Sequence, residues 1–257
     1  MKKTRIDLYM VEKGYAPSRT KAQDAIKAGF VTLKEDQKMR LVNSPSELID
    51  EDRPAEIIIQ KSSLDKYVSR AGLKMEGALN QLQLNVEDMT VLDVGISTGG
   101  FTDCLLQRGA DSVVGVDVGH NQLSQKLKAH PKIKSFEGVN AREIHKNEAI
   151  QKTKPGQGFD LIAIDVSFIS LTLVLSSVIQ LLRPGGSVLA LVKPQFEVGP
   201  EGLGKNGIVK DEKLYGQVHQ KIEECVKSLN GKNIRYFESE LEGKDGNKEF
   251  FIFFKKD

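Results

Sequence analysis

Five apolar segments alternate with helical segments between residues 90 and 193, and this alternation limits the possible folds more than any other feature of the sequence. Continuous apolar runs are typical of parallel strands whose two faces are both covered by helices. The segments read TVLDV, SVVGVDV, KIKSF, FDLIAID and SVLALVK. Two further strand-like runs surround a Gly-Asn pair in the final segment, NIRYFESELEGKDGNKEFFIFFKK, and predict a hairpin. The sequence therefore predicts an α/β domain with a mostly parallel, seven-stranded sheet that ends in an antiparallel hairpin.

The first sixty residues predict a separate, small α+β domain. Thr4 is expected to cap a helix that runs from Arg5 to Gly14, and Ser18 to cap a second that ends at Gly29. Short strands are expected at FVTL and EIIIQ. An apolar stripe is predicted on each helix, formed by Leu8 and Val11 on the first and by Ala22, Ala25 and Ile26 on the second.

These patterns divide the chain into three segments. Residues 1–61 form the small domain, residues 62–89 hold a linker and the first helix of the larger domain, and residues 90–257 form the rest of that domain.

The net charge of +2 gives no overall preference for nucleic acid, so a basic surface has to be local. Residues 1–40 supply such a surface, with ten Lys or Arg against five Asp or Glu.

The cellular compartment follows from the cysteines and from the apolar segments. Cys104 and Cys225 are expected to be free thiols, which are typical of a reducing cytoplasm. The start of the chain, MKKTRIDLYMVEKGY, lacks the apolar core of a targeting peptide. Residues 161–182 form the most apolar window, but they contain Asp165 and four serines, and so predict a buried strand, a turn and a helix. We therefore expect a cytoplasmic protein without a membrane segment.

Charged residues end four of the predicted strands. They are Asp93, Asp117, Asp165 and Lys193. Ligands of open α/β sheets bind beyond the carboxyl ends of the strands, so these side chains predict a ligand site there.

The turn after the first of these strands predicts which ligand binds. Gly95-Ile-Ser-Thr-Gly99-Gly100 departs from the G-x-G-x-x-G fingerprint, which argues against NAD or FAD. The turn suits a ligand with a carboxylate and an amine, and Asp117 is placed for a ribose diol. Both features fit S-adenosylmethionine; an ordinary glycine turn is the alternative. The predicted cofactor-binding residues are Asp93, Gly95, Ser97, Thr98, Gly99, Gly100, Asp117 and Asp165. A tight turn at Pro184-Gly185-Gly186, between a helix and the fifth strand, supports the same interpretation.

Five motifs together resemble one known family. YVSRAGLKMEGAL, LDVGISTGGFTD, VVGVDVGHNQL, IDVSFISL and VKPQFEVG are similar to the TlyA group, also called hemolysin A. The resemblance implies a Rossmann-like, S-adenosylmethionine-dependent ribosomal RNA methyltransferase with an FtsJ-type catalytic domain. RIDLYMVEKGYAPSRTKAQDAIKAGFV resembles the αL RNA-binding module of a ribosomal protein. The partners implied are ribosomal RNA or ribosomal subunits, with contacts at Arg5, Arg19, Lys21 and Arg70 of the basic N-terminal region.

FtsJ-type enzymes methylate a ribose 2′-hydroxyl with a Lys-Asp-Lys-Glu tetrad, which the resemblance places at Lys74, Asp165, Lys193 and Glu249. A hydroxyl is a weak acid, so methyl transfer needs its proton removed or its developing negative charge stabilised. A nearby lysine lowers the pKa of a lysine, and a nearby carboxylate raises it. The sequence leaves open whether Lys193 is a base or an oxyanion partner.

Structural roles without catalysis are an alternative for the same residues. Lys74 could be a solvated helix lysine and Asp165 the N-cap of a following helix. Asp165-Val-Ser-Phe168 lacks the two prolines that amino-group methylators carry in the corresponding motif. Cys104 is expected in core packing, not as a nucleophile. His120 and His145 show no metal-ligand spacing, so no metal site is expected.

Three function classes remain. They are an RNA 2′-O-methyltransferase, an RNA-binding protein without catalysis, and a membrane-damaging hemolysin. The tetrad argues against the second class, and the lack of a spanning segment or a strongly amphipathic basic helix argues against the third. The sequence predicts neither the modified nucleotide nor the oligomeric state.

Overall fold

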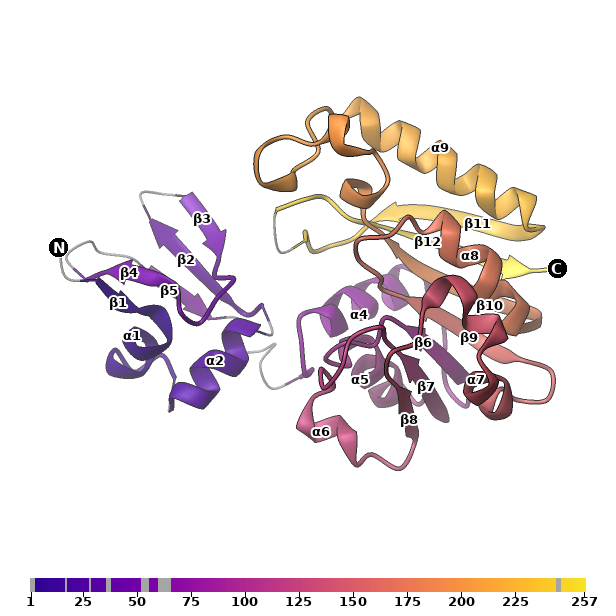
Figure 1. Ribbon diagram of the computed structural model, residues 1–257, viewed down its shortest axis with the longest axis horizontal. Coiled ribbons are helices and arrows are strands. Elements are labelled where there is room, and N and C mark those ends of the chain that lie inside the picture. The colour runs from indigo at the N-terminus through magenta and orange to yellow at the C-terminus, as the bar shows by residue number, and fades with distance from the viewer. Residues whose placement is uncertain are drawn as a thin grey trace. The chain divides into compact units, whose positions relative to one another are not determined.

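The chain forms two compact units, Met1–Leu73 and Lys74–Asp257, in a computed structural model (Figure 1). The structure describes residues 3–16, 18–27, 29–35, 38–51, 56–59, 66–243 and 246–257.

A seven-stranded sheet is the centre of the second unit. Its strand order is β11-β12-β10-β9-β6-β7-β8. The strands are β6 (Thr90–Val94), β7 (Ser112–Val116), β8 (Ile133–Phe136), β9 (Phe159–Ile164), β10 (Leu182–Val192), β11 (Gly231–Glu238) and β12 (Phe250–Lys256). The five strands from β10 to β8 are parallel to one another, and β12 is antiparallel to both β10 and β11. This topology confirms the predicted mostly parallel sheet with its antiparallel C-terminal hairpin.

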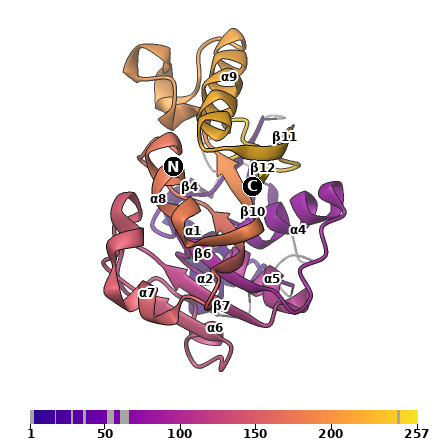
Figure 2. The ribbon, with the colours of Figure 1, turned by 90° about the vertical axis from the view of Figure 1, so that its right-hand side faces the viewer.

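Helices cover both faces of this sheet (Figures 1 and 2). They are α4 (Ala71–Leu82), α5 (Gly100–Gln107), α6 (Gln125–Lys128), α7 (Glu148–Thr153), α8 (Thr172–Val178) and α9 (Lys213–Ser228). Apolar residues of α8 and α9 pack on alternate residues of the strands, such as Leu92 and Ile162. Helices α4 and α5 lie on the opposite face, where Phe101 of α5 stacks on Phe251 of β12. Because both faces are covered, the central strands are buried almost throughout, which explains their continuous apolar sequences.

The Pro-Gly-Gly stretch differs from the prediction of a tight turn before the fifth strand. Strand β10 already begins at Leu182, directly after a 3₁₀ turn that follows α8. Its pairing with β9 shifts between Leu182 and Ser187, so Pro184-Gly185-Gly186 forms an irregularity inside the strand. Proline cannot donate a ladder hydrogen bond and glycine tolerates unusual backbone angles, so this tripeptide suits a bulge.

The window of residues 161–182 has the predicted strand-turn-helix structure: it runs through β9, a loop and α8. Among the residues that the structure describes, no helix combines the length and the apolar composition needed to cross a membrane.

The first unit contains two helices and five short strands among its described residues. Helices α1 (Ile6–Glu12) and α2 (Arg19–Lys27) pack beside a two-stranded sheet of β1 and β4 and a three-stranded sheet in the order β3-β2-β5. The strands are β1 (Lys3–Arg5), β2 (Val31–Glu35), β3 (Lys38–Leu41), β4 (Leu48–Asp50) and β5 (Glu56–Ile59). Ile6, Met10, Ile26 and Leu33 belong to the buried core of this unit.

The prediction for the first helix is wrong in two respects. Thr4 is no helix cap, because it lies in β1 and pairs with Ile49 of β4. The buried side of α1 carries Ile6 and Met10, which are four residues apart and so lie on one face, whereas Leu8 is 43% exposed. The cap of the second helix is confirmed, since Ser18 Oγ accepts a hydrogen bond from the Lys21 N–H at 3.3 Å.

Candidate active site

Lys193 and Asp165 form an ion pair at the carboxyl edge of the sheet. Asp165 directly follows β9 and Lys193 directly follows β10, and these strands are parallel neighbours. Their side chains meet with Lys193 Nζ 2.6 Å from Asp165 Oδ1. The same amine donates a hydrogen bond to Ser167 Oγ at 2.9 Å. Only 13% of the Lys193 side chain and 20% of the Asp165 side chain is exposed, so this ion pair is largely shielded from water.

Glu249 and Lys74 form a second buried ion pair beside the first. Glu249 directly precedes β12, and Phe250 of β12 lies opposite Val192 of β10. The antiparallel pairing thus places Glu249 next to Lys193. The Glu249 carboxylate pairs with the amine of Lys74 on α4, and both side chains are at most 10% exposed. The structure therefore brings together all four residues of the predicted tetrad.

The two carboxylates determine the protonation of Lys193. Burial lowers the pKa of Lys193, but Asp165 and Glu249 raise it by more, so the pKa lies above its ordinary value. Lys193 is therefore an ammonium ion at neutral pH in the ligand-free protein.

The alternative role of Asp165 as a helix cap is wrong. Helix α8 begins at Thr172, and its N-cap residue is Leu171. The Leu171 N–H donates to Glu197 Oε1 at 2.6 Å. Glu197 therefore provides the hydrogen-bond acceptor at the start of α8, whereas Asp165 pairs with Lys193.

The glycine turn after β6 needs its glycines. Gly95 and Gly99 have φ angles of +88° and +91°, a region that favours glycine. A Cβ on Gly95 would overlap the backbone carbonyl of Asp165, so the turn and the tetrad loop touch each other. Gly100 begins α5, as the sequence predicts for a strand-turn-helix unit.

Asp117 holds this turn through backbone hydrogen bonds. Its Oδ2 accepts from the Ser97 N–H at 2.9 Å, and its Oδ1 accepts from the Gly119 N–H at 2.7 Å. Ser97 Oγ donates to Gln122 Oε1, and the Thr98 carbonyl accepts from the Ser124 N–H. The predicted cofactor residues from 95 to 100 thus form one hydrogen-bonded loop with Asp117.

Asp93 lies inside the sheet and not at its edge. Strand β6 continues to Val94, and Asp93 is fully buried. Its Oδ2 accepts a hydrogen bond from Thr102 Oγ1 at 2.6 Å, whereas Oδ1 has no hydrogen-bond partner among the described residues. Burial raises the pKa of Asp93 to about 7, so its carboxyl group changes charge near physiological pH.

We expect Asp93→Asn to remove a pH dependence of stability. Between pH 4 and pH 7 the unfolded chain has an ionised Asp93 while the folded chain keeps it protonated, so wild-type stability falls as the pH rises. Relative to the wild type, the variant should gain up to about 4 kcal/mol in unfolding free energy over this range. Urea unfolding at several pH values measures it, with Asp88→Asn at an exposed position as control. Parallel pH curves for Asp93→Asn and the wild type would contradict this prediction.

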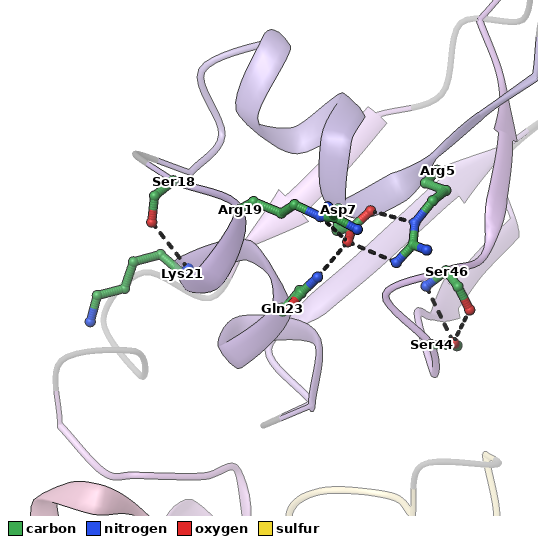
Figure 3. Close-up of polar contacts among 8 residues, drawn as sticks. All are labelled: Arg5, Asp7, Ser18, Arg19, Lys21, Gln23, Ser44 and Ser46. Atoms are coloured by element: carbon green, nitrogen blue, oxygen red, sulfur yellow. Dashed lines mark hydrogen bonds and ion pairs between the residues drawn. The ribbon is translucent and has the colours of Figure 1, made fainter.

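Two of the predicted RNA-binding arginines surround a buried carboxylate. Asp7 on α1 is fully buried, and it accepts hydrogen bonds from Arg5, Arg19 and Gln23 at 2.7–3.0 Å (Figure 3). Burial raises the pKa of Asp7, but these hydrogen bonds outweigh it and hold the pKa far below its usual range. Arg5 and Arg19 therefore stabilise the first unit in addition to any contact with RNA.

The other two predicted RNA-binding residues lie in different surroundings. Lys21 is exposed on α2, and its side chain extends away from the Asp7 cluster in Figure 3. Arg70 is half-buried and lies just before α4.

Phe168 is a feature of the site that sequence reasoning missed. It is 90% exposed, has a φ angle of +62°, and follows Ser167, the hydroxyl partner of Lys193. Its ring centroid lies 5.0 Å from that of Phe196. The sequence signal was an aromatic residue in the DVSF motif, but a sequence does not reveal that such a ring points to solvent.

The residues considered for other chemistry have ordinary surroundings. Cys104 is buried in α5 and Cys225 is half-buried, and both are free thiols. His120 is exposed beside Glu137, and His145 Nδ1 lies 2.6 Å from Ser177 Oγ. Within the described residues, no three His, Cys, Asp or Glu side chains are grouped so that they could hold a metal ion.

Comparison with protein families gives a match over most of the chain. Residues 67–256 match the family described as FtsJ-like methyltransferase. YqxC of Bacillus subtilis (strain 168), whose name proposes rRNA methyltransferase activity, is 41% identical over 98% of this chain and 85% of its own. The 16S/23S rRNA (cytidine-2′-O)-methyltransferase TlyA of Mycobacterium tuberculosis (strain H37Rv) is 34% identical over 99% of this chain and 90% of its own.

Solved structures share the fold. A Streptococcus thermophilus structure named as a proposed hemolysin is 38% identical, and the match covers 100% of this chain and 89% of that one with a TM-score of 0.70. An S-adenosylmethionine-dependent methyltransferase from Mesorhizobium loti is 14% identical, with a TM-score of 0.50 over 71% of this chain and 98% of its own. The second likeness concerns the fold alone, and it agrees with the predicted methyltransferase-type α/β fold.

Proposed function

Because the chain belongs to the FtsJ-like methyltransferase family, we propose that it transfers a methyl group from S-adenosylmethionine to a ribose 2′-hydroxyl of ribosomal RNA. The observation that carries this proposal is that two buried ion pairs, Lys193–Asp165 and Lys74–Glu249, lie side by side at the carboxyl edge of the sheet. The names of the relatives support ribosomal RNA as the substrate, and such a substrate would place the enzyme in the cytoplasm.

Residues of the glycine turn would hold the cofactor. The loop from Gly95 to Gly100 brings backbone close to the tetrad, and Asp117 at the end of β7 would accept hydrogen bonds from the ribose hydroxyls. The buried Oδ1 of Asp93 lacks a partner among the described residues, which fits an acceptor reserved for a polar ligand. When bound, S-adenosylmethionine supplies the electrophilic methyl group.

Lys193 would act on the hydroxyl as an ammonium ion. Asp165 and Glu249 keep the amine protonated, so it can donate a hydrogen bond to the 2′-oxygen and stabilise negative charge that develops there. The proton of the hydroxyl passes to the Asp165 carboxylate, the acid nearest to this amine. Lys74 holds Glu249 in place, and Glu249 in turn favours the charged form of Lys193.

Labelled methyl transfer to isolated ribosomal subunits tests the proposal. We expect labelled ribosomal RNA whose modified nucleotide resists alkaline hydrolysis, because a methylated 2′-oxygen cannot attack the adjacent phosphate. A modified base with normal sensitivity to alkali would instead indicate methylation of a base. RNA binding without label would indicate a protein that has no catalytic activity. Lysis of erythrocytes or lipid vesicles without label would favour the membrane-damaging alternative.

Residues 1–61 would capture the RNA. Within this region, residues 1–40 have an excess of five basic residues, ten Lys or Arg minus five Asp or Glu. Lysine and arginine release counterions from phosphates when they bind, so the affinity should fall with salt. Because Arg5 and Arg19 hold the buried Asp7, reversing their charge would disturb folding. Lys21 is the cleaner site for a charge-reversal test.

We expect Lys21→Glu to weaken RNA binding and to flatten its salt dependence. The loss of one phosphate contact should reduce the log–log slope by roughly 0.7 for single-stranded RNA. Filter binding of ribosomal RNA at several salt concentrations measures this slope. Lys152→Glu, at an exposed position on α7, serves as the matched control. An unchanged slope in Lys21→Glu would assign Lys21 to a solvated surface.

A further inference from the structure

Glu197 is a buried acid outside the tetrad, four residues after Lys193. Only 2% of its side chain is exposed. Its Oε1 accepts from the Leu171 N–H at 2.6 Å, and its Oε2 accepts from Ser170 Oγ at 2.7 Å. A buried carboxylate carries a large desolvation cost, and these hydrogen bonds offset it together with Lys221 of α9, whose Nζ lies 2.7 Å from Oε2.

These contacts close a ring around the amine of Lys193. A short 3₁₀ helix, Pro194–Phe196, connects Lys193 to Glu197 along the chain. Glu197 then holds Ser170 and Leu171, which end the loop that begins at Asp165. Ser167 of that loop accepts the hydrogen bond from Lys193 Nζ and so completes the ring.

The ring also holds a strained residue. Phe168, with its φ of +62°, lies on the loop between Asp165 and Ser170. Its aromatic side chain contacts that of Phe196 in the 3₁₀ helix. A non-glycine residue in this region persists only where its surroundings fix it. The two segments that Glu197 joins are thus also the two segments that Phe168 and Phe196 join.

We propose that Glu197 is a positioning residue for methyl transfer, which fixes the 165–171 loop against the turn after Lys193 and thereby sets Ser167 at the reacting amine. This inference rests on the proposed role of Lys193. A cap for α8 alone would require only the contact to Leu171, whereas the bond to Ser170 and the closed connection to Ser167 act on the loop itself.

A double-mutant cycle between Glu197 and Ser167 tests the proposal. Glu197→Gln keeps an acceptor for the Leu171 N–H but loses the negative charge that holds Lys221. We expect kcat to fall about tenfold or more, because displacement of a reacting group by about 1 Å can cost 100-fold. The dissociation constant for S-adenosylmethionine should change less than twofold. In the Ser167→Ala background, Glu197→Gln should lower kcat much less, because the contact between Ser167 and Lys193 that transmits its effect is already lost.

Two controls separate this positioning role from a structural one. Lys227→Gln, on the same helix as Lys221 and paired with the partly exposed Glu223, should leave kcat unchanged. Urea unfolding shows whether each variant is folded under assay conditions. Equal losses of kcat for Glu197→Gln in both backgrounds, or no loss in either, would overturn the proposal. Failure of the proposed function looks different, since the wild-type protein would then transfer no labelled methyl group to ribosomal RNA.

Discussion

Replacing Lys193 with alanine is expected to lower the rate of methyl transfer by about 100- to 10,000-fold. The side chain is the ammonium group next to Asp165, and the pKa of Lys193 is raised by Asp165 and Glu249 despite burial. Alanine removes the hydrogen-bond donor at the reacting oxygen and also leaves Asp165 without its cation. Affinity for S-adenosylmethionine should persist, because the glycine turn from Gly95 to Gly100 is held by Asp117 and not by Lys193.

Two measurements make this prediction specific. Single-turnover methyl transfer gives the chemical rate, and calorimetry gives the affinity for S-adenosylmethionine. Lys152→Ala is the matched control, because Lys152 is an exposed lysine that pairs only with Glu148 in the described contacts. If Lys193→Ala retains the wild-type rate, the tetrad has been assigned wrongly. If it stays folded but loses cofactor affinity as well, Lys193 has a structural role.

Gly95→Ala is expected to abolish cofactor binding and to destabilise the second unit. Gly95 has a φ of +88°, and the left-handed region costs a residue with a Cβ about 1–2 kcal/mol. The new methyl group would also overlap the backbone carbonyl of Asp165, which cannot move without displacing the tetrad. We therefore expect a loss of more than about 2 kcal/mol in unfolding free energy.

Gly216→Ala provides the matched control for Gly95→Ala. Gly216 lies within α9, and a Cβ there would have no neighbour within 4 Å. Alanine favours helix over glycine, so this variant should gain about 0.5–1 kcal/mol. Urea unfolding and calorimetry with S-adenosylmethionine distinguish the two variants. Wild-type affinity in Gly95→Ala would show that the turn does not hold the cofactor.

The sheet could be predicted because its signal is local. Strands such as β6 and β9 are buried on both faces, and their sequences are apolar without interruption. Asp165 and Lys193 directly follow such runs, so their common edge follows from the rule for parallel strands. Asp93 was wrongly placed at the edge, although the predicted segment TVLDV already extends to Val94, where β6 ends.

The errors arise where distant segments decide local structure. Thr4 has the chemistry of a helix cap, but pairing with Ile49 places it in a strand. Arg5 and Arg19 are predicted as RNA contacts from their charge, and only the packed unit shows that they also surround the buried Asp7. Tertiary contacts, and not local preference, decide both cases.

The tetrad was identified by resemblance, and its geometry needed the structure. Lys74 and Glu249 are 175 residues apart in the sequence, and no periodicity connects a helix lysine to a residue before a distant strand. Glu197 was missed because an acid in VKPQFEVG carries no local sign of burial. Its hydrogen bonds to Ser170 and Leu171 become visible only when the loop is folded.

The position of β12 between β10 and β11 also bears on how the protein folds. Contacts between residues that are far apart in sequence form slowly, because a long loop must close before the contact contributes. The glycine turn needs only β6 and β7, which are neighbours in sequence, whereas Glu249 reaches Lys74 only after β12 has inserted. A folding intermediate with a loose C-terminal hairpin would thus have its cofactor turn but no complete tetrad. Catalytic competence would then be among the last properties that the chain acquires, and activity would report complete folding more strictly than cofactor binding does.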